Sequence, residues 1–167
     1  SKNSKNILEK LDFEIIRNVI TKSCKIKLHF VNQDERENNK RMILNFGHTF
    51  AHGIEAANNY SRKINHGEAV LMGMMLAAKL SLRKKICSRD TLSKIENFYR
   101  INNLPKNLNI FFSKKRLDNI VDFMKIDKKN YDNKINLILL KRIGKTTVPG
   151  SVRISPKEIK SVLKKIS

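Results

Sequence analysis

The sequence is poor in cysteine, long apolar runs, flexible linkers and acidic residues. Its two cysteines, Cys24 and Cys87, lie far apart without a partner spacing, so neither a disulfide framework nor a cysteine-based zinc site is indicated. No apolar run approaches the length of a bilayer span, and residues 1–6 lack the apolar core of a signal peptide, which predicts a cytoplasmic protein. Without internal repeats or Gly/Ser/Pro-rich linkers, the 167 residues predict one domain.

The shortage of acidic residues leaves a large positive charge. Fifteen Asp and Glu stand against thirty-five Lys and Arg, for a formal net charge of +20 and a pI near 10.2. This balance suits nucleic acid, anionic lipid or phosphorylated metabolites as partners. The lysines are scattered with asparagine through every segment, so a compositional bias of solvated positions explains them equally well. Any metal would be held by His and carboxylate side chains.

Apolar periodicity, caps and breaks predict a mainly α, multi-helical fold with one small β-hairpin. The expected helices span about residues 12–32, 34–58, 66–85, 88–101, 113–124 and 155–166. The run 135–140, then Gly144 and residues 146–148, is typical of the hairpin. Residues 7–11 resemble the end of a helix whose beginning is missing, which suggests that the chain is cut from something longer.

One predicted helix carries a narrow polar stripe on an otherwise apolar or small surface. At 100° per residue, its polar side chains fall within roughly 80°. They are Arg41, Asn45, His48, His52 and Glu55, with Glu37 one turn earlier. Because buried polar groups are costly without partners, such a stripe indicates a ligand or metal on that side, although bulk water would satisfy it as well.

A second chemical signal begins at His66. The positive end of a helix dipole disfavours imidazolium there, which keeps a neutral, metal-competent ring available, and the same dipole explains Glu68 structurally. A zinc ion with an open position takes three protein ligands, commonly His and carboxylate, and His48 and His66 would supply two. His52 would be a further ligand or an acid–base group. His29 has no such context and is interpreted as a surface residue.

Two groups of lysines lie where an anion could be bound. Lys27 shares the apolar side of its predicted helix with Ile20, Cys24 and Val31. Its stem could pack while the ammonium reaches water, or the ammonium could be directed into a binding site. The run 127–129 follows a helix, where cations are favoured by the dipole in any case.

These residues together closely resemble the C-terminal domain of 3-dehydroquinate synthases. The family signature is an Arg, then Leu-Asn-(Phe/Leu)-Gly-His-Thr-(Phe/Leu)-Gly-His-Ala-Ile-Glu, and later His-Gly-Glu-Ala-Val. In this chain it stands at Arg41, 44–55 and 66–70, with matching segments at 34–37 and 127–129. Ala51 and Gly53 exchange two small residues of the usual pattern. The resemblance covers about residues 8–160.

The resemblance implies part of an enzyme, a lyase of the shikimate pathway that leads to chorismate and the aromatic amino acids. It would use NAD+ and a divalent metal, Zn2+ or Co2+, to convert 3-deoxy-D-arabino-heptulosonate 7-phosphate to 3-dehydroquinate and phosphate. The implied partners are a phosphorylated sugar acid and, at full length, a second copy in a homodimer, with no nucleic acid and no membrane.

The family pattern also indicates what residues 1–167 do not contain. The third metal ligand, a Glu, and the NAD-binding α/β domain precede this region in the family, and no Gly-rich strand–turn–helix occurs in the chain. We therefore expect this C-terminal helical domain to bind zinc weakly by itself and to turn over nothing.

By motif match, the resemblance implies a role for each candidate residue. His48 and His66 would be metal ligands. The substrate-binding residues would be Lys27, Arg41, Asn45 and His52, the four also assigned to catalysis, with Lys128 or Lys129 as a further cation. Glu37 would orient these polar side chains as a hydrogen-bonding partner without binding the ligand itself. Cations around a phosphate position it and stabilise departing charge.

Two alternatives stay open. A related sugar-phosphate cyclase, of the 2-deoxy-scyllo-inosose or valiolone synthase type, would share the metal site and differ in substrate contacts; the set Arg41, Asn45 and His52 favours dehydroquinate synthase. A basic nucleic-acid-binding module is a different class. It predicts Lys and Arg clustered with aromatic residues, or a recognition motif, and the sequence has neither.

Overall fold

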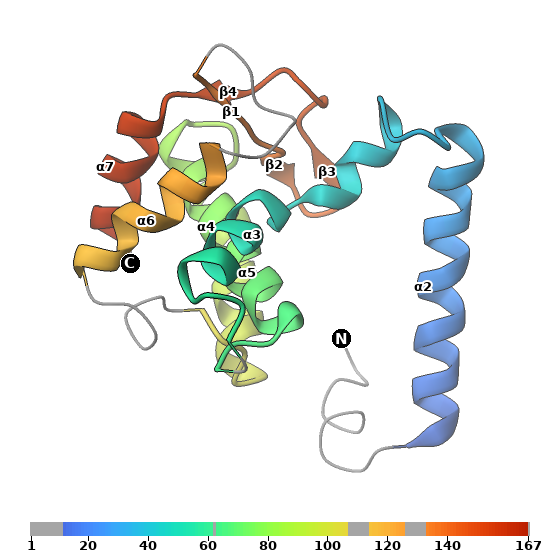
Figure 1. Ribbon diagram of the computed structural model, residues 1–167. Helices are drawn as coiled ribbons and strands as arrows, with labels where there is room; N and C mark the ends of the chain where they lie inside the picture. The colour runs from blue at the N-terminus through green and yellow to red at the C-terminus, as the bar shows by residue number, and fades with distance from the viewer. Residues whose placement is uncertain (1–11, 62, 107–113, 126–132, 167) are drawn as a thin grey trace. The chain divides into compact units, whose positions relative to one another are not determined.

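The computed structural model describes residues 12–61, 63–106, 114–125 and 133–166 of the chain (Figure 1). The chain divides into two compact units, residues 1–42 and 43–167, and each is described here by itself. Within the described ranges, none of the helices combines the length and hydropathy that crossing a bilayer requires.

Helix α2 (Phe13–Gln33) is the one regular helix in the described part of residues 1–42. It begins as predicted at Asp12, whose side chain accepts a hydrogen bond from the backbone N–H of Ile15 at 3.1 Å. No residue of the helix is buried, and several of its apolar side chains are open to solvent, Ile20 for example being 57% exposed. The local start signal was therefore sufficient to predict the helix, although its apolar side forms no core.

The carboxylate of Asp34 organises the loop that follows α2. It accepts backbone N–H bonds from Asn38 at 3.0 Å, Asn39 at 2.7 Å and Arg41 at 3.0 Å. Glu37 has a φ of +56°, a left-handed conformation that an α-helix excludes. The helix predicted to begin at residue 34 is therefore wrong, because the acidic side chain closes a loop there instead of capping a helix.

The same predicted helix is interrupted a second time before its histidines. The 3₁₀-helix η1 (Lys40–Asn45) ends ahead of Gly47, and α3 (His48–Ala57) begins directly after it. Gly47 has a φ of +84°, and a Cβ there would lie 2.6 Å from the backbone nitrogen of Met74. Only glycine fits this turn and this close approach. The polar stripe expected on one helix from Arg41 to Glu55 is thus divided, and only its last three members share α3.

Helix α4 (His66–Arg83) packs against α3 and carries much of the core. It starts with a capping box, in which the Asn65 side chain accepts from the Glu68 N–H and the Glu68 carboxylate accepts from the Asn65 N–H. At Gly73, the backbone of α4 meets the carbonyl oxygen of Gly47 so closely that a Cβ would overlap it. This contact brings the start of α3 onto the middle of α4.

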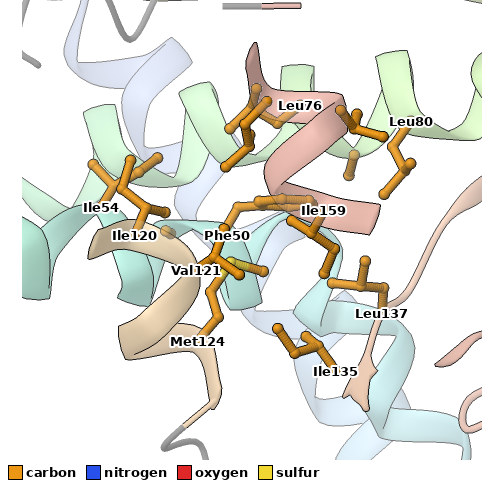
Figure 2. Close-up of a cluster of buried hydrophobic side chains, with 14 of the residues drawn as sticks. Phe50, Ile54, Leu76, Leu80, Ile120, Val121, Met124, Ile135, Leu137 and Ile159 are labelled. Carbon is orange, nitrogen blue, oxygen red and sulfur yellow. The ribbon is translucent and has the colours of Figure 1, made fainter. Parts of the chain in front are cut away.

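Three further helices lie in the described part of residues 43–167. They are α5 (Arg89–Ile101), α6 (Lys114–Lys125) and α7 (Pro156–Ile166). Helix α5 lies on α4, while α6 packs against both α3 and α7. Figure 2 shows side chains from α3, α4, α6, α7 and the strand region meeting in one core, with Phe50, Ile54, Leu76, Leu80, Ile120, Val121, Met124, Ile135, Leu137 and Ile159 labelled.

The predicted hairpin is present with shorter, shifted strands, and residues 135–136 of its expected first strand pair elsewhere. The hairpin is β2 (Leu140–Arg142) with β3 (Lys145–Thr146). A second antiparallel pair joins β1 (Ile135–Asn136) to β4 (Arg153–Ile154). The buried Ser81 hydroxyl on α4 donates to the Ala77 carbonyl and accepts from the Leu140 N–H at 2.9 Å, which ties the hairpin to the helical core.

Candidate functional site

Three imidazole rings gather where α3 meets α4. His48 and His52 lie one turn apart on α3, and their ring centroids are 6.1 Å apart. His66 is the first residue of α4, and its ring centroid lies 5.8 Å from that of His48. The packing of the two helices therefore brings together the three histidines that the sequence singled out, and α4 starts at His66 as predicted.

His48 is the member of this cluster whose ring lies near both of the others. Its Nδ1 atom is buried and accepts or donates no hydrogen bond among the described residues. Burial lowers the pKa of His48, and positive charge on His52 or His66 lowers it further, while the Phe46 backbone and the Glu55 carboxylate act in the opposite direction. The net lowering of the His48 pKa favours the neutral ring, which is the form that coordinates a metal.

His66 is anchored by a carboxylate from the neighbouring helix. Its Nδ1 lies 2.9 Å from Oε1 of Glu55, near the end of α3. The Glu55 side chain is 16% exposed and the His66 side chain 59% exposed. The sequence placed Glu55 on the same face as His48 and His52 but assigned it no function. The signal available in the sequence was its position three residues after His52, which puts the two side chains on neighbouring positions of one helix face.

The spacing of two of the rings fits two ligands of one metal ion. Because a zinc–nitrogen bond is about 2.0–2.1 Å long, two imidazoles on one ion have ring centroids on the order of 5–6 Å apart. The 5.8 Å between His48 and His66 lies in that range. Across the described ranges, no group of three His, Cys, Asp or Glu side chains is placed to hold an ion. Two histidine ligands therefore fit, and a complete site does not occur in this part of the chain.

In the unit of residues 1–42, the loop closed by Asp34 holds two candidate residues, Glu37 and Arg41. The Arg41 guanidinium lies 3.8 Å from the Glu37 carboxylate and donates to the Glu35 carbonyl at 2.7 Å. Both charged side chains are about one-quarter exposed. Lys27 is exposed on α2, and no residue of that helix is buried. Its binding role is therefore still a prediction from the sequence.

The remaining candidates have less defined surroundings. Asn45 ends η1 and is half-buried. Lys128 and Lys129 lie outside the described residues. His29 is exposed, with its Nε2 2.7 Å from the Gln33 side-chain nitrogen, which agrees with its interpretation as a surface residue.

Comparisons with known proteins identify similar chains over nearly the whole length. The family described as 3-dehydroquinate synthase C-terminal matches residues 1–130. A 3-dehydroquinate synthase of Pelagibacter ubique strain HTCC1062 is 46% identical over 165 residues, covering 99% of this chain and 44% of that protein. One of Thermoanaerobacter pseudethanolicus is 41% identical over 161 residues, covering 95% and 43%. The chain thus spans less than half the length of these relatives.

Solved structures of sugar-phosphate cyclases share the fold. A 2-deoxy-scyllo-inosose synthase in complex with carbaglucose-6-phosphate, NAD+ and Co2+ superposes with a TM-score of 0.61 at 25% identity, covering 78% of this chain and 35% of that one. A 2-epi-5-epi-valiolone synthase from Streptomyces hygroscopicus subsp. jinggangensis 5008, with NAD+ and Zn2+ bound, has a TM-score of 0.75 at 20% identity over 98% and 43%. These likenesses confirm the predicted mainly helical fold.

Proposed function

This chain belongs to the 3-dehydroquinate synthase C-terminal family, and from that premise we propose that it supplies the metal- and substrate-binding part of a 3-dehydroquinate synthase. The reaction would convert 3-deoxy-D-arabino-heptulosonate 7-phosphate to 3-dehydroquinate and phosphate in the shikimate pathway. The observation that carries the proposal is that the rings of His52 and His66 lie 6.1 Å and 5.8 Å from that of His48, where α3 meets α4. The buried Nδ1 atom of His48, which has no hydrogen-bond partner among the described residues, favours a ligand for this cluster.

His48 and His66 are the proposed metal ligands. The ion of choice is Zn2+, with Co2+ as the alternative, which the Co2+ in the complex of the 2-deoxy-scyllo-inosose synthase makes reasonable for a related site. When bound, a divalent ion makes a substrate hydroxyl easier to deprotonate and the adjacent hydride easier to remove. The third ligand, a Glu, and the NAD+ site are assigned to a part of the protein beyond residues 1–167, since the chain spans 44% of the Pelagibacter relative.

The chain's other candidates bind and orient an anionic substrate. A guanidinium recognises carboxylate or phosphate through paired hydrogen bonds, and Glu37 and the Glu35 carbonyl hold Arg41 in one orientation for that purpose. His52, exposed one turn beyond His48, would by motif match transfer a proton near the phosphate. Lys27, Asn45 and Lys128 or Lys129 add further contacts by motif match. Cytoplasmic location and a homodimer at full length complete the proposal.

A chimeric enzyme tests this function directly. The matching 44% of the Pelagibacter protein is replaced by this chain, and phosphate release is measured with the substrate, NAD+ and Zn2+. We expect turnover from the chimera, none from the isolated chain, and a loss of at least about 100-fold with His48→Ala. His29→Ala, a surface histidine, is the matched control and leaves the rate unchanged. Full activity of His48→Ala would remove the proposed metal site.

A related cyclase activity is the second candidate, and the fold shared with 2-deoxy-scyllo-inosose synthase at 25% identity is the observation in its favour. The 46% identity to a 3-dehydroquinate synthase favours the first. Offering the chimera 3-deoxy-D-arabino-heptulosonate 7-phosphate and the substrate of the related cyclase separately decides between them, because turnover of the second substrate alone contradicts the main proposal. A steeply salt-dependent affinity for duplex DNA without metal would instead indicate the nucleic-acid-binding alternative.

A further inference from the structure

Glu55 touches the candidate metal site without belonging to its proposed ligands. Its Oε1 lies 2.9 Å from Nδ1 of His66, and the contact joins the end of α3 to the start of α4. The carboxylate is mostly buried, at 16% exposed, whereas the imidazole is 59% exposed. The less exposed carboxylate has less freedom to move, and the exposed ring takes its orientation from the hydrogen bond.

The chemistry of the two groups determines which nitrogen carries the proton. An ionised carboxylate accepts hydrogen bonds and donates none, so Nδ1 of His66 must be the protonated nitrogen of this contact. In the neutral ring, the other nitrogen, Nε2, then keeps its lone pair. The contact thus selects the one tautomer that offers Nε2 to an ion.

A purely structural reason for Glu55 is disfavoured by its place in the helix. It lies in the last turn of α3, where the negative end of the helix dipole opposes an acidic side chain. Glu68 illustrates the opposite case, because it lies in the first turn of α4 and closes a capping box. Glu55 therefore lowers the stability of α3, whereas Glu68 raises that of α4.

We infer that Glu55 is a positioning residue that fixes the orientation and the Nδ1–H tautomer of His66, so that Nε2 is directed to the metal. The inference rests on the proposed function, in which His66 is a ligand. Carboxylates that accept from the second nitrogen of a metal-bound histidine raise its basicity and affinity for the ion. Glu55 itself touches neither substrate nor ion in this assignment.

The tautomer is measured in the metal-free, 167-residue chain by long-range ¹H–¹⁵N NMR of the imidazoles above the pH at which they lose their charge. We expect the wild-type His66 to carry its proton on Nδ1, and Glu55→Ala to shift it towards the mixture typical of an exposed histidine. Glu68→Ala, which loosens the helix start without touching the ring, keeps the Nδ1–H form. A His66 protonated on Nε2 in the wild type would overturn the inference.

Zinc affinity is the second readout, measured by competition with a chromophoric chelator on the same chain. Glu55→Ala should weaken Zn2+ binding about 10–100-fold, and Glu55→Gln, which keeps an acceptor oxygen without the charge, less than that. Glu68→Ala should stay within about twofold, and circular dichroism checks that each variant is folded. A loss with His48→Ala but none with Glu55→Ala overturns the Glu55 inference alone. No loss with either overturns the metal site of the proposed function.

Discussion

Residues 12–42 and residues 43–167 place their candidate side chains by different forces. In the larger unit, helices α3, α4, α6 and α7 bury a common core, and the positions of His48, His52 and His66 follow from that packing. In the smaller unit, α2 buries no residue, and Arg41 is held by the hydrogen bonds of the Asp34 loop. Core packing is cooperative, whereas a loop of this kind opens locally. Changes to the core should therefore affect the three histidines together, and changes to the loop only the side chains that the loop holds.

The largest effect is expected from Gly73→Ala. A Cβ at this position overlaps the Gly47 carbonyl oxygen, and neither backbone can move without separating α3 from α4. We expect the unfolding free energy of residues 43–167 to fall by at least about 3 kcal/mol, with zinc affinity lost in parallel. Denaturant unfolding measures this. Gly67→Ala is the control, because its Cβ would meet only the Asn65 side chain at 3.4 Å, and equal destabilisation by both changes would contradict the argument.

The second prediction concerns alkaline pH and Tyr99, whose hydroxyl donates to the Leu71 carbonyl at 2.8 Å. Burial raises the pKa of Tyr99 to about 12. The folded state holds the proton more tightly than the unfolded state, so this stability is complete below pH 10 and is lost as pH rises through 12. The loss amounts to about 3 kcal/mol. The difference in unfolding free energy between the wild type and Tyr99→Phe should change by this amount over that pH range. The same difference for Tyr60→Phe, at an exposed position, should not change.

Ser81→Ala should have a smaller effect on the same unit. The change leaves the buried Leu140 N–H without its acceptor, which costs about 1–3 kcal/mol. Calorimetric unfolding would measure the loss. Ser161→Ala, an exposed serine on α7, should change the unfolding free energy by no more than about 0.5 kcal/mol. A neutral Ser81→Ala would mean that the hydroxyl does not anchor the hairpin.

The smallest effect on stability is expected from Asp34→Ala. Desolvation acts to raise the pKa of Asp34, but backbone N–H bonds from Asn38, Asn39 and Arg41 and the Arg41 charge together lower it below its ordinary value. These bonds are therefore complete above that value and lost as pH falls through the lowered pKa.

Hydrogen exchange measures this loop apart from the core. Asp34→Ala should speed exchange of the amides it held, while the unfolding midpoint of residues 43–167 stays unchanged. Glu35→Ala, which leaves its carbonyl in place, should do neither. A lowered midpoint in Asp34→Ala would show that the loop supports the core, and the comparison between the two units would fail.

Most helices could be predicted because their start signals are local. Asp12 caps α2, Ser88 caps α5, and Ser155 bonds the Glu158 N–H at the start of α7, in each case through a side chain three residues away. The helix predicted over 34–58 was wrong because the chain turns at Gly47, where its backbone lies against Met74. Met74 is 27 positions further along the chain, so no local pattern reveals this contact. The β1–β4 pair was missed for the same reason, since its two-residue strands are paired across the hairpin.

The candidate site divides in the same way between sequence and structure. The types and order of Arg41, Asn45, His48, His52 and His66 are a property of the sequence, and they suffice to identify the family because the motif is long and correctly spaced. The tertiary structure alone decided that the His48 and His66 rings lie 5.8 Å apart and that Glu55 is the partner of His66. The order of residue types is given by the sequence itself. Distances between helices depend instead on side-chain volumes and on glycines such as Gly47 and Gly73, which let two backbones touch.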